Sequence, residues 1–237
     1  MKFLVFQHVP HEHPGLLTRY AEQEGVALDI VELWKNYKIP SVPRYNALII
    51  MGGPMGVYDS GDKYPSKDDE VAAIKNAVGN IPVLGICLGS QILAHTLGAK
   101  VYPNTIEGKR VKEIGYYTVD LTPEGRDDII FRGFSPHTRV LQWHGDAFDL
   151  PAGAKLLATS PLCRTQAFSY GNAYGLLFHF EFTPQMIERQ TEIDKDWIHK
   201  DHEIGEAQLL EEANKNAPLM EKQCKTLFDN FLSMVKP

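Results

Sequence analysis

The sequence predicts an α/β protein with three layers, in which helices cover both faces of an open, mostly parallel sheet. Short apolar runs alternate with helix-prone segments in βαβα order, which is typical of such a sheet. One apolar run also passes without a spacer into a helical segment, as at the carboxyl end of a parallel strand. The expected strands are residues 3–6, 27–33, 47–51 and 82–87, and the expected helices are residues 15–23 and 67–78.

The middle and the end of the chain predict additions to this core. Residues 100–157 carry shorter alternating segments, which indicate a small antiparallel extension. The last part of the chain has the pattern of amphipathic helices, broken near Gly205 and Pro218. We therefore expect one domain over residues 1–185 and a helical extension over residues 186–237 that packs on it. The extension could also serve as a docking surface for a partner or as a lid.

Length and composition exclude several classes of function. The 237 residues suit one α/β domain with a sizeable core. A formal net charge of −6 offers no basic surface, so neither nucleic acid nor an anionic membrane is an expected partner. There is no targeting segment at the start and no apolar run of transmembrane length. Three widely separated cysteines suit a reducing compartment, and we expect a cytoplasmic protein.

Cys87 lies in the sequence Gly-Ile-Cys-Leu-Gly, where a strand signal meets a helix signal. The residue between them must occupy a tight turn, and its small neighbours let the backbone fold closely around it. This pattern predicts a nucleophile elbow that presents the thiol outward. The N-terminus of the following helix should favour the thiolate and lower the pKa of the cysteine. The alternative is a buried, inert structural cysteine.

His179 and Glu181 lie two residues apart in an apolar, aromatic run. On a strand this spacing puts both side chains on one face, so the carboxylate can orient the imidazole while the other ring nitrogen faces Cys87. Burying two ionisable groups is costly unless they pair. We therefore predict a catalytic set of Cys87, His179 and Glu181, against the alternative of a structural His–Glu pair. His144 is a weaker candidate for the base because Gly145 and Asp146, which follow it, suit a turn.

Taken together, several motifs resemble the class I glutamine amidotransferase family, which includes the glutaminase domain of GMP synthase. The resemblance covers about residues 1–185 and implies the flavodoxin-like fold of that family. The motifs are at residues 51–56, 85–91, 143–146, 166–168 and 178–181. In the family, a cysteine attacks the side-chain amide of glutamine, a thioester forms with release of ammonia, and water hydrolyses the thioester to glutamate. The resemblance implies that Cys87 is the nucleophile, His179 the general base and acid, and Glu181 the residue that holds the histidine.

Each acyl step places negative charge on the carbonyl oxygen, so N–H donors are needed there. The backbone N–H of Leu88, directly after the nucleophile, is one candidate. The resemblance points to Gly53 as the other, in a glycine loop that could otherwise be an ordinary turn.

Substrate contacts are expected from three further residues. Gln91 lies one helical turn after Cys87, and the matching residue of the family contacts the glutamine substrate. Trp143 and His144 lie where a predicted strand runs into a loop, and in relatives this segment approaches the amino and carboxylate groups of the substrate. One departure is Phe180, where most relatives have proline; the spacing from histidine to glutamate is unchanged.

The acceptor of the ammonia is not encoded in a recognisable motif. No pyrophosphate loop, Walker motif or dinucleotide fingerprint is present, so ammonia would pass to a separate synthase subunit. Alternatively the chain is a free-standing hydrolase of glutamine or another γ-glutamyl compound, or a non-catalytic binding protein on the same scaffold. Homodimerisation is left open. No cofactor and no metal is expected; the loop with His8, His11 and His13 resembles a metal cluster but is better interpreted as a rim of the active site.

Overall fold

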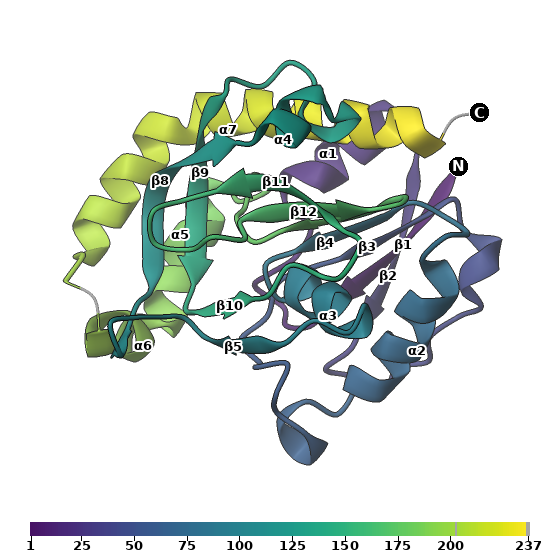
Figure 1. The fold of residues 1–237 in the computed structure, drawn as a ribbon, viewed down its shortest axis with the longest axis horizontal. Coiled ribbons are helices and arrows are strands. Elements are labelled where there is room, and N and C mark those ends of the chain that lie inside the picture. The colour runs from purple at the N-terminus through teal and green to yellow at the C-terminus, as the bar shows by residue number, and fades with distance from the viewer. Residues whose placement is uncertain (202, 236–237) are drawn as a thin grey trace.

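The computed structural model describes residues 1–201 and 203–235 and contains a nine-stranded sheet with helices on both faces (Figure 1). Half of the sheet is parallel, with the strand order β2-β1-β3-β4-β13. The predicted α/β architecture is therefore confirmed. These strands are β1 (Lys2–Gln7), β2 (Ala27–Glu32), β3 (Ala47–Ile50), β4 (Val83–Ile86) and β13 (Ala173–Leu176).

The antiparallel extension continues the same sheet in the order β12-β11-β8-β9. Two short antiparallel pairs, β5 with β10 and β6 with β7, lie beside it. The strands are β5 (Val101–Pro103), β6 (Thr105–Ile106), β7 (Lys109–Arg110), β8 (Glu113–Leu121), β9 (His137–His144), β10 (Asp146–Phe148), β11 (Lys155–Thr159) and β12 (Ala167–Tyr170).

The helices cover the two faces of the sheet and make two separate cores. Helices α1, α5 and α7 contribute to one core, and α2 and α3 to the other. Side chains of β1 alternate between the cores, because successive residues of a strand point to opposite faces. The helices are α1 (Leu16–Gln23), α2 (Lys67–Ala77), α3 (Leu88–Thr96), α4 (Pro123–Asp127), α5 (Pro184–Ile193), α6 (Lys195–Asp201) and α7 (Glu206–Val235), with short 3-10 turns η1 (Val42–Arg44), η2 (Gly61–Lys63) and η3 (Ile129–Phe131).

The predicted helix break at Pro218 is wrong. Helix α7 runs through Pro218 and crosses the molecule along α1 and α5 (Figure 1). A proline inside a helix removes one hydrogen bond and costs about 3 kcal/mol. Here Ala213, Met220 and Cys224 are all buried, so packing on both sides of the proline offsets that cost. The predicted break near Gly205 is confirmed, since α7 begins directly after it.

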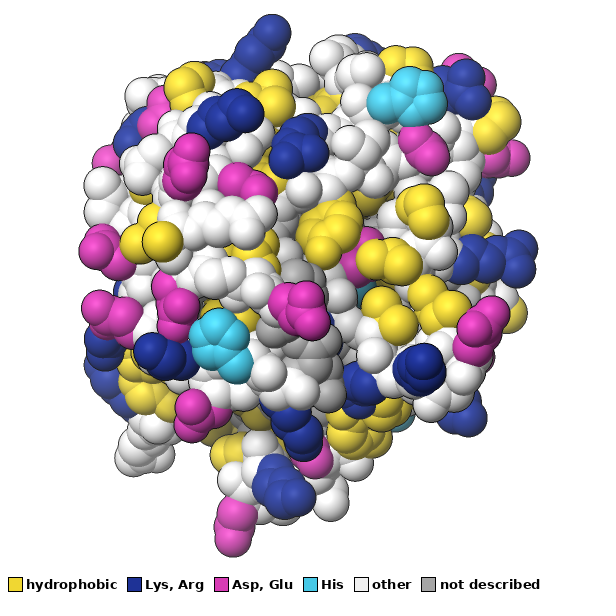
Figure 2. Space-filling view, turned by 90° about the vertical axis from the view of Figure 1, so that its left-hand side faces the viewer, with side chains coloured by type: hydrophobic (Ala, Val, Ile, Leu, Met, Phe, Trp, Pro, Cys, Tyr) yellow, Lys and Arg dark blue, Asp and Glu magenta, His cyan; other side chains and the backbone are white. Residues whose placement is uncertain are grey.

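The surface carries charges of both signs. On the side of the molecule occupied by β8, α6 and the first half of α7, basic and acidic side chains are interspersed (Figure 2). Within residues 1–201 and 203–235, every helix is too short or too polar to cross a lipid bilayer.

The connection from β4 to α3 is the predicted tight turn. Cys87 occupies it with φ 52° and ψ −112°, a region that non-glycine residues rarely adopt. The small neighbours are required by close packing. A Cβ at Gly85 would lie 2.4 Å from the Gly89 carbonyl oxygen, and a Cβ at Gly89 would lie 2.1 Å from the Ile50 carbonyl oxygen.

Replacing Gly89 with alanine should therefore destabilise the fold. The added methyl group would push α3 away from β3, and we expect the free energy of unfolding to fall by about 3 kcal/mol. Urea denaturation measures this change. Gly205→Ala is the matched control, because nothing lies within 4 Å of its Cβ position, and it should change stability by less than about 1 kcal/mol. Equal stability of Gly89→Ala and the unmodified protein would contradict this account of the turn.

Candidate functional site

A pocket of about 310 Å³ opens at the carboxyl ends of β3 and β4, where open α/β sheets bind their ligands. It brings together residues from distant parts of the chain. Five residues singled out from the sequence line it, namely Gly53, Cys87, Gln91, Trp143 and His144. Of the remaining predicted residues, Leu88 begins α3 directly after Cys87, and His179 and Glu181 lie buried behind the pocket wall.

Cys87 is 6% exposed, and its sulfur lies 3.7 Å from the backbone oxygen of Trp143. Burial raises the pKa of this thiol, and the interaction with His179 and the Leu88 backbone opposes that rise without cancelling it. The lowered pKa expected at the start of the helix is therefore wrong. The thiol is so thoroughly desolvated that the loss of water outweighs the helix N-terminus.

His179 and Glu181 are paired, but they do not lie on a strand. Strand β13 ends at Leu176, and His179 is held by a single bridge, in which its N–H donates to the Leu141 oxygen at 2.8 Å. The expected strand geometry is therefore wrong, while the pair itself is present. His179 Nδ1 lies 2.7 Å from Glu181 Oε1, and the other carboxylate oxygen accepts from the Phe180 N–H at 3.1 Å.

This pairing sets the tautomer and the charge of His179. Burial alone would lower the pKa of the imidazole, but the Glu181 charge and the interactions with Cys87 and Glu181 raise that pKa well above 6.5. Because Nδ1–H donates to the carboxylate, Nε2 is the nitrogen left for other chemistry. Nε2 is buried and makes no hydrogen bond within the described ranges. It is the ring nitrogen that remains for the interaction with Cys87.

The loop after β3 is held in place by a hydrogen bond to the side chain of His8. His8 Nδ1 lies 2.9 Å from the Gly52 carbonyl oxygen, and a Cβ at Gly53 would lie 2.9 Å from both the His8 and the Leu88 side chains. A peptide group is planar, and in a trans peptide its C=O and N–H point in opposite directions. The Gly52 oxygen faces His8, so the Gly53 N–H points away from His8.

His8 belongs to a buried polar cluster that the sequence interpretation missed. Its Nε2 lies 2.9 Å from Glu70 Oε2, and both side chains are fully buried. Tyr64 and Ser66 complete the cluster, with Ser66 Oγ donating to Glu70 Oε1 at 2.6 Å. Both ring nitrogens of His8 face oxygen acceptors, as in an imidazolium. Burial would lower the pKa of His8, but Glu70 and the Gly52 hydrogen bond outweigh it and raise the pKa.

The predicted substrate-contact residues differ in their environments. Gln91 is 4% exposed and its amide makes no hydrogen bond within the described part of the chain. Trp143 donates from Nε1 to Asp194 Oδ2 at 2.8 Å. His144 makes one hydrogen bond, between Nδ1 and the backbone oxygen of Asp146 at 3.0 Å. Its Nε2 lies 3.1 Å from a carboxylate oxygen of Glu113, but in a direction that does not form a hydrogen bond.

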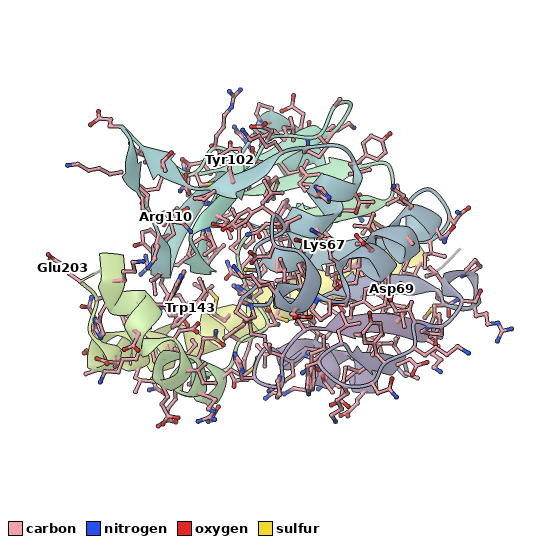
Figure 3. The ribbon with its side chains drawn as sticks, turned by 90° about the horizontal axis from the view of Figure 1, so that it is seen from below. Lys67, Asp69, Tyr102, Arg110, Trp143 and Glu203 are labelled. Carbon is pink, nitrogen blue, oxygen red and sulfur yellow. The ribbon has the colours of Figure 1, made fainter. Side chains whose placement is uncertain are left out.

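The C-terminal helices close one side of the pocket. The sequence did not predict that these helices contribute to the site. Gln190, Asp194 and Trp197 all line it. Figure 3 shows Trp143 and Arg110 at the end of the molecule that α5 and α6 occupy. Nothing in the local pattern of these helices distinguishes a wall of the pocket from an ordinary surface.

The loop after β1 does not form the metal cluster that its histidines resemble. His8 is buried under the Gly52 loop, whereas Glu12 lines the pocket and His13 accepts from the Gly15 N–H. Among residues 1–201 and 203–235, no group of three or more His, Cys, Asp or Glu side chains is arranged to hold a metal ion. Through Glu12, the loop reaches the pocket.

The chain is similar to known amidotransferases along most of its length. The family model of "Glutamine amidotransferase class-I" matches residues 15–196. A glutamine amidotransferase-like protein of Salmonella typhimurium, YfeJ, is 31% identical over 85% of this chain and 82% of that protein. A glutamine-hydrolyzing GMP synthase subunit of Sulfolobus acidocaldarius is 28% identical over 73% of this chain and 86% of that protein. The crystal structure of a Thermotoga maritima glutamine amidotransferase aligns with a TM-score of 0.88 and 34% identity, covering 100% of this chain and 98% of the other.

The His8–Glu70 pair should make stability depend on pH. Glu70→Gln leaves His8 without its charge partner, and we expect a loss of about 3 kcal/mol of unfolding free energy near pH 6. His8 has a higher pKa folded than unfolded, so its contribution is complete below about pH 6.5 and disappears as pH rises through the folded value. The difference between variant and unmodified protein should therefore shrink at alkaline pH.

Urea denaturation at a series of pH values measures this difference. Asp68→Asn is the control, since Asp68 is an exposed carboxylate in the same first turn of α2. A deficit of Glu70→Gln that stays constant from pH 6 to pH 10 would refute the protonated state of His8.

Proposed function

This chain belongs to the class I glutamine amidotransferase family, and we propose that it hydrolyses the side-chain amide of L-glutamine to glutamate and ammonia through a thioester on Cys87. The observation that carries this proposal is that Cys87 lines the pocket and interacts with His179, whose Nδ1 pairs with Glu181 and whose Nε2 is buried without a partner among the described residues.

The proposed reaction moves one proton back and forth. His179 Nε2 takes the proton of Cys87, and the sulfur attacks the amide carbon. His179 then gives the proton to the nitrogen as the carbon–nitrogen bond breaks. Glu181 stabilises the imidazolium that exists between these steps, because its carboxylate accepts from Nδ1–H. Water repeats the sequence on the thioester. The raised pKa of His179 favours the imidazolium that forms when the proton leaves Cys87.

The oxyanion would be stabilised by the N–H groups of Leu88 and Gly53. Leu88 is the first residue of α3, so its N–H is not used within the helix. The direction of the Gly53 N–H follows from the hydrogen bond between His8 and the Gly52 oxygen. His8 is thus a positioning residue. As an imidazolium it can donate to Gly52 and Glu70 at once, whereas a neutral ring has only one donor.

Substrate recognition is assigned to Gln91, Trp143 and His144. The amide of Gln91 is unpaired and lines the pocket, so it can contact the substrate directly. Trp143 supplies a ring wall and fixes Asp194. His144 faces the pocket but is also held by Asp146 and Glu113, which favours a rigid contact over acid–base chemistry.

Two fates of the ammonia remain to be compared. One relative is a subunit of GMP synthase, which supports transfer of ammonia to a separate acceptor subunit. The second candidate is a free-standing hydrolase of glutamine or another γ-glutamyl amide. A specific observation favours it: the chain's own helices close one side of the pocket through Gln190, Asp194 and Trp197.

Release of glutamate by the isolated chain tests these alternatives. We expect hydrolysis of L-glutamine or of a γ-glutamyl amide, with a loss of at least about 10⁴-fold in Cys87→Ala, because the thioester cannot form. Cys163→Ala is the matched control, as Cys163 is buried away from the pocket. Activity alone supports the hydrolase. Labelling of Cys87 by a glutamine-analogue diazoketone without turnover supports a missing acceptor subunit, and absence of both would refute the proposed reaction.

The positioning role of His8 predicts a specific kinetic defect. In Glu70→Gln the imidazole loses its charge partner and becomes neutral, so it can no longer hold both acceptors. We expect kcat to fall about 10- to 100-fold while KM changes less than about twofold, since oxyanion donors act in the transition state. Asp68→Asn again serves as the control. Steady-state kinetics well below the melting temperature measure both constants; an unchanged kcat, or an effect on KM alone, would contradict the role.

A further inference from the structure

Glu12 has no role in the reaction described so far, yet it is one of the most unusual groups in the molecule. It is 94% buried, since only 6% of its surface is exposed, and it lines the pocket beside Cys87. Its carboxyl group makes no hydrogen bond within residues 1–201 and 203–235. Because this carboxyl lines the pocket and pairs with no described residue, a ligand bound in the pocket can supply its partner.

The backbone makes room for this carboxyl. A Cβ at Gly52 would lie 2.2 Å from Glu12 Oε2 and 3.4 Å from His179 Cε1. The bare Cα of Gly52 therefore leaves a place where the carboxyl sits between the glycine loop and the imidazole. Glycine is required here for space, because its φ is not in the left-handed region.

The four charged neighbours of Glu12 come from three segments. They are His8 after β1, His179 and Glu181 after β13, and Asp194 at the end of α5. Burial raises the pKa of Glu12 to about 7; His179 and His8 oppose the shift, whereas Asp194 and Glu181 add to it. The carboxyl can therefore change charge near neutral pH.

We propose that Glu12 forms a subsite for a primary amine or ammonium ion, which receives the leaving group of the amide. This rests on the proposed function. His179 must give its proton to the leaving nitrogen, so that nitrogen lies beside His179, and Glu12 lies there too. When the carbon–nitrogen bond breaks, its electron pair stays on nitrogen and His179 supplies one proton. The neutral amine then takes the proton of the Glu12 carboxyl, which leaves an ammonium–carboxylate pair.

This subsite bears on the fate of the nitrogen. An acceptor subunit needs neutral ammonia as a nucleophile, whereas Glu12 converts the amine to a cation and holds it. The subsite thus fits a hydrolase that discards the amine. It also fits γ-glutamyl amides of primary amines, whose released amine would be bound in the same way.

Charge-selective labelling of Cys87 tests the subsite without requiring turnover. Two size-matched methanethiosulfonates are used, one with a 2-aminoethyl group and one with a neutral propyl group. Each transfers its alkylthio group to the Cys87 thiolate and releases methanesulfinate. The ratio of the two rates cancels the thiolate fraction. Cys87→Ala gives the background from other cysteines.

The unmodified protein should prefer the cationic reagent about eightfold at pH 7.5 and about twofold at pH 6, as the carboxylate is protonated. Glu12→Gln should lower the ratio to about one at both pH values. Glu22→Gln removes an exposed carboxylate of α1 and should keep the original ratio. Labelling by the neutral reagent shows that each variant retains an open site.

A cation preference that persists in Glu12→Gln, or is absent from the unmodified protein, would overturn the subsite, as would failure of either reagent to reach Cys87. A Glu12-dependent preference with neither glutamate release nor labelling of Cys87 by the glutamine-analogue diazoketone would refute the proposed reaction while leaving the amine subsite intact. The two proposals can therefore fail separately.

Discussion

The close approach of α3 to the sheet is the constraint on which the pocket depends. Because Gly89 packs directly on the Ile50 carbonyl, the chain between β4 and α3 has no room for a gradual turn, and Cys87 is held at φ 52°. Such a conformation costs about 1–3 kcal/mol for a non-glycine residue. This conformation places the sulfur of Cys87 at the start of α3, next to the Leu88 N–H, which has no partner within the helix. The same contact fixes the end of β3, from which Gly52 and Gly53 extend.

Within this frame, burial decides the protonation of the site. Loss of water raises the pKa of Cys87 more than the helix N-terminus can lower it, so the thiol is not an exposed, ready nucleophile. The pKa of His179 is raised as well, through Glu181 and Cys87. The interaction with His179 lowers the pKa of Cys87, so a thiolate costs less beside this imidazole than it would alone. The nucleophile is generated only where its partner is already in place.

The sequence predicts the parts of the fold and site that depend on local pattern. The strand–turn–helix at Cys87, the βαβα alternation that predicts a parallel sheet, and the His179–Glu181 pair all leave a local signal in the sequence. The rest depends on contacts between distant segments. His8 and Glu70 are 62 residues apart, and the helical stretch around Pro218 persists because of packing on other helices, so no local window reveals either. Burial likewise reversed the expected pKa shift of Cys87, since the depth of a thiol is a tertiary property.

One loop, between β1 and α1, supplies two charged groups that the reaction can use in opposite senses. As the amide breaks, its oxygen gains negative charge and its nitrogen ends as a cation. The imidazolium of His8 lies behind the peptide that faces the oxygen, and the carboxyl of Glu12 lies beside His179 on the side of the nitrogen. The charge of His8 is present before substrate arrives, whereas the carboxylate of Glu12 forms as the released amine takes its proton. In the proposed site, the loop that first resembled a metal cluster therefore supplies a positive charge behind the oxygen and a proton donor beside the nitrogen of the bond that is cleaved.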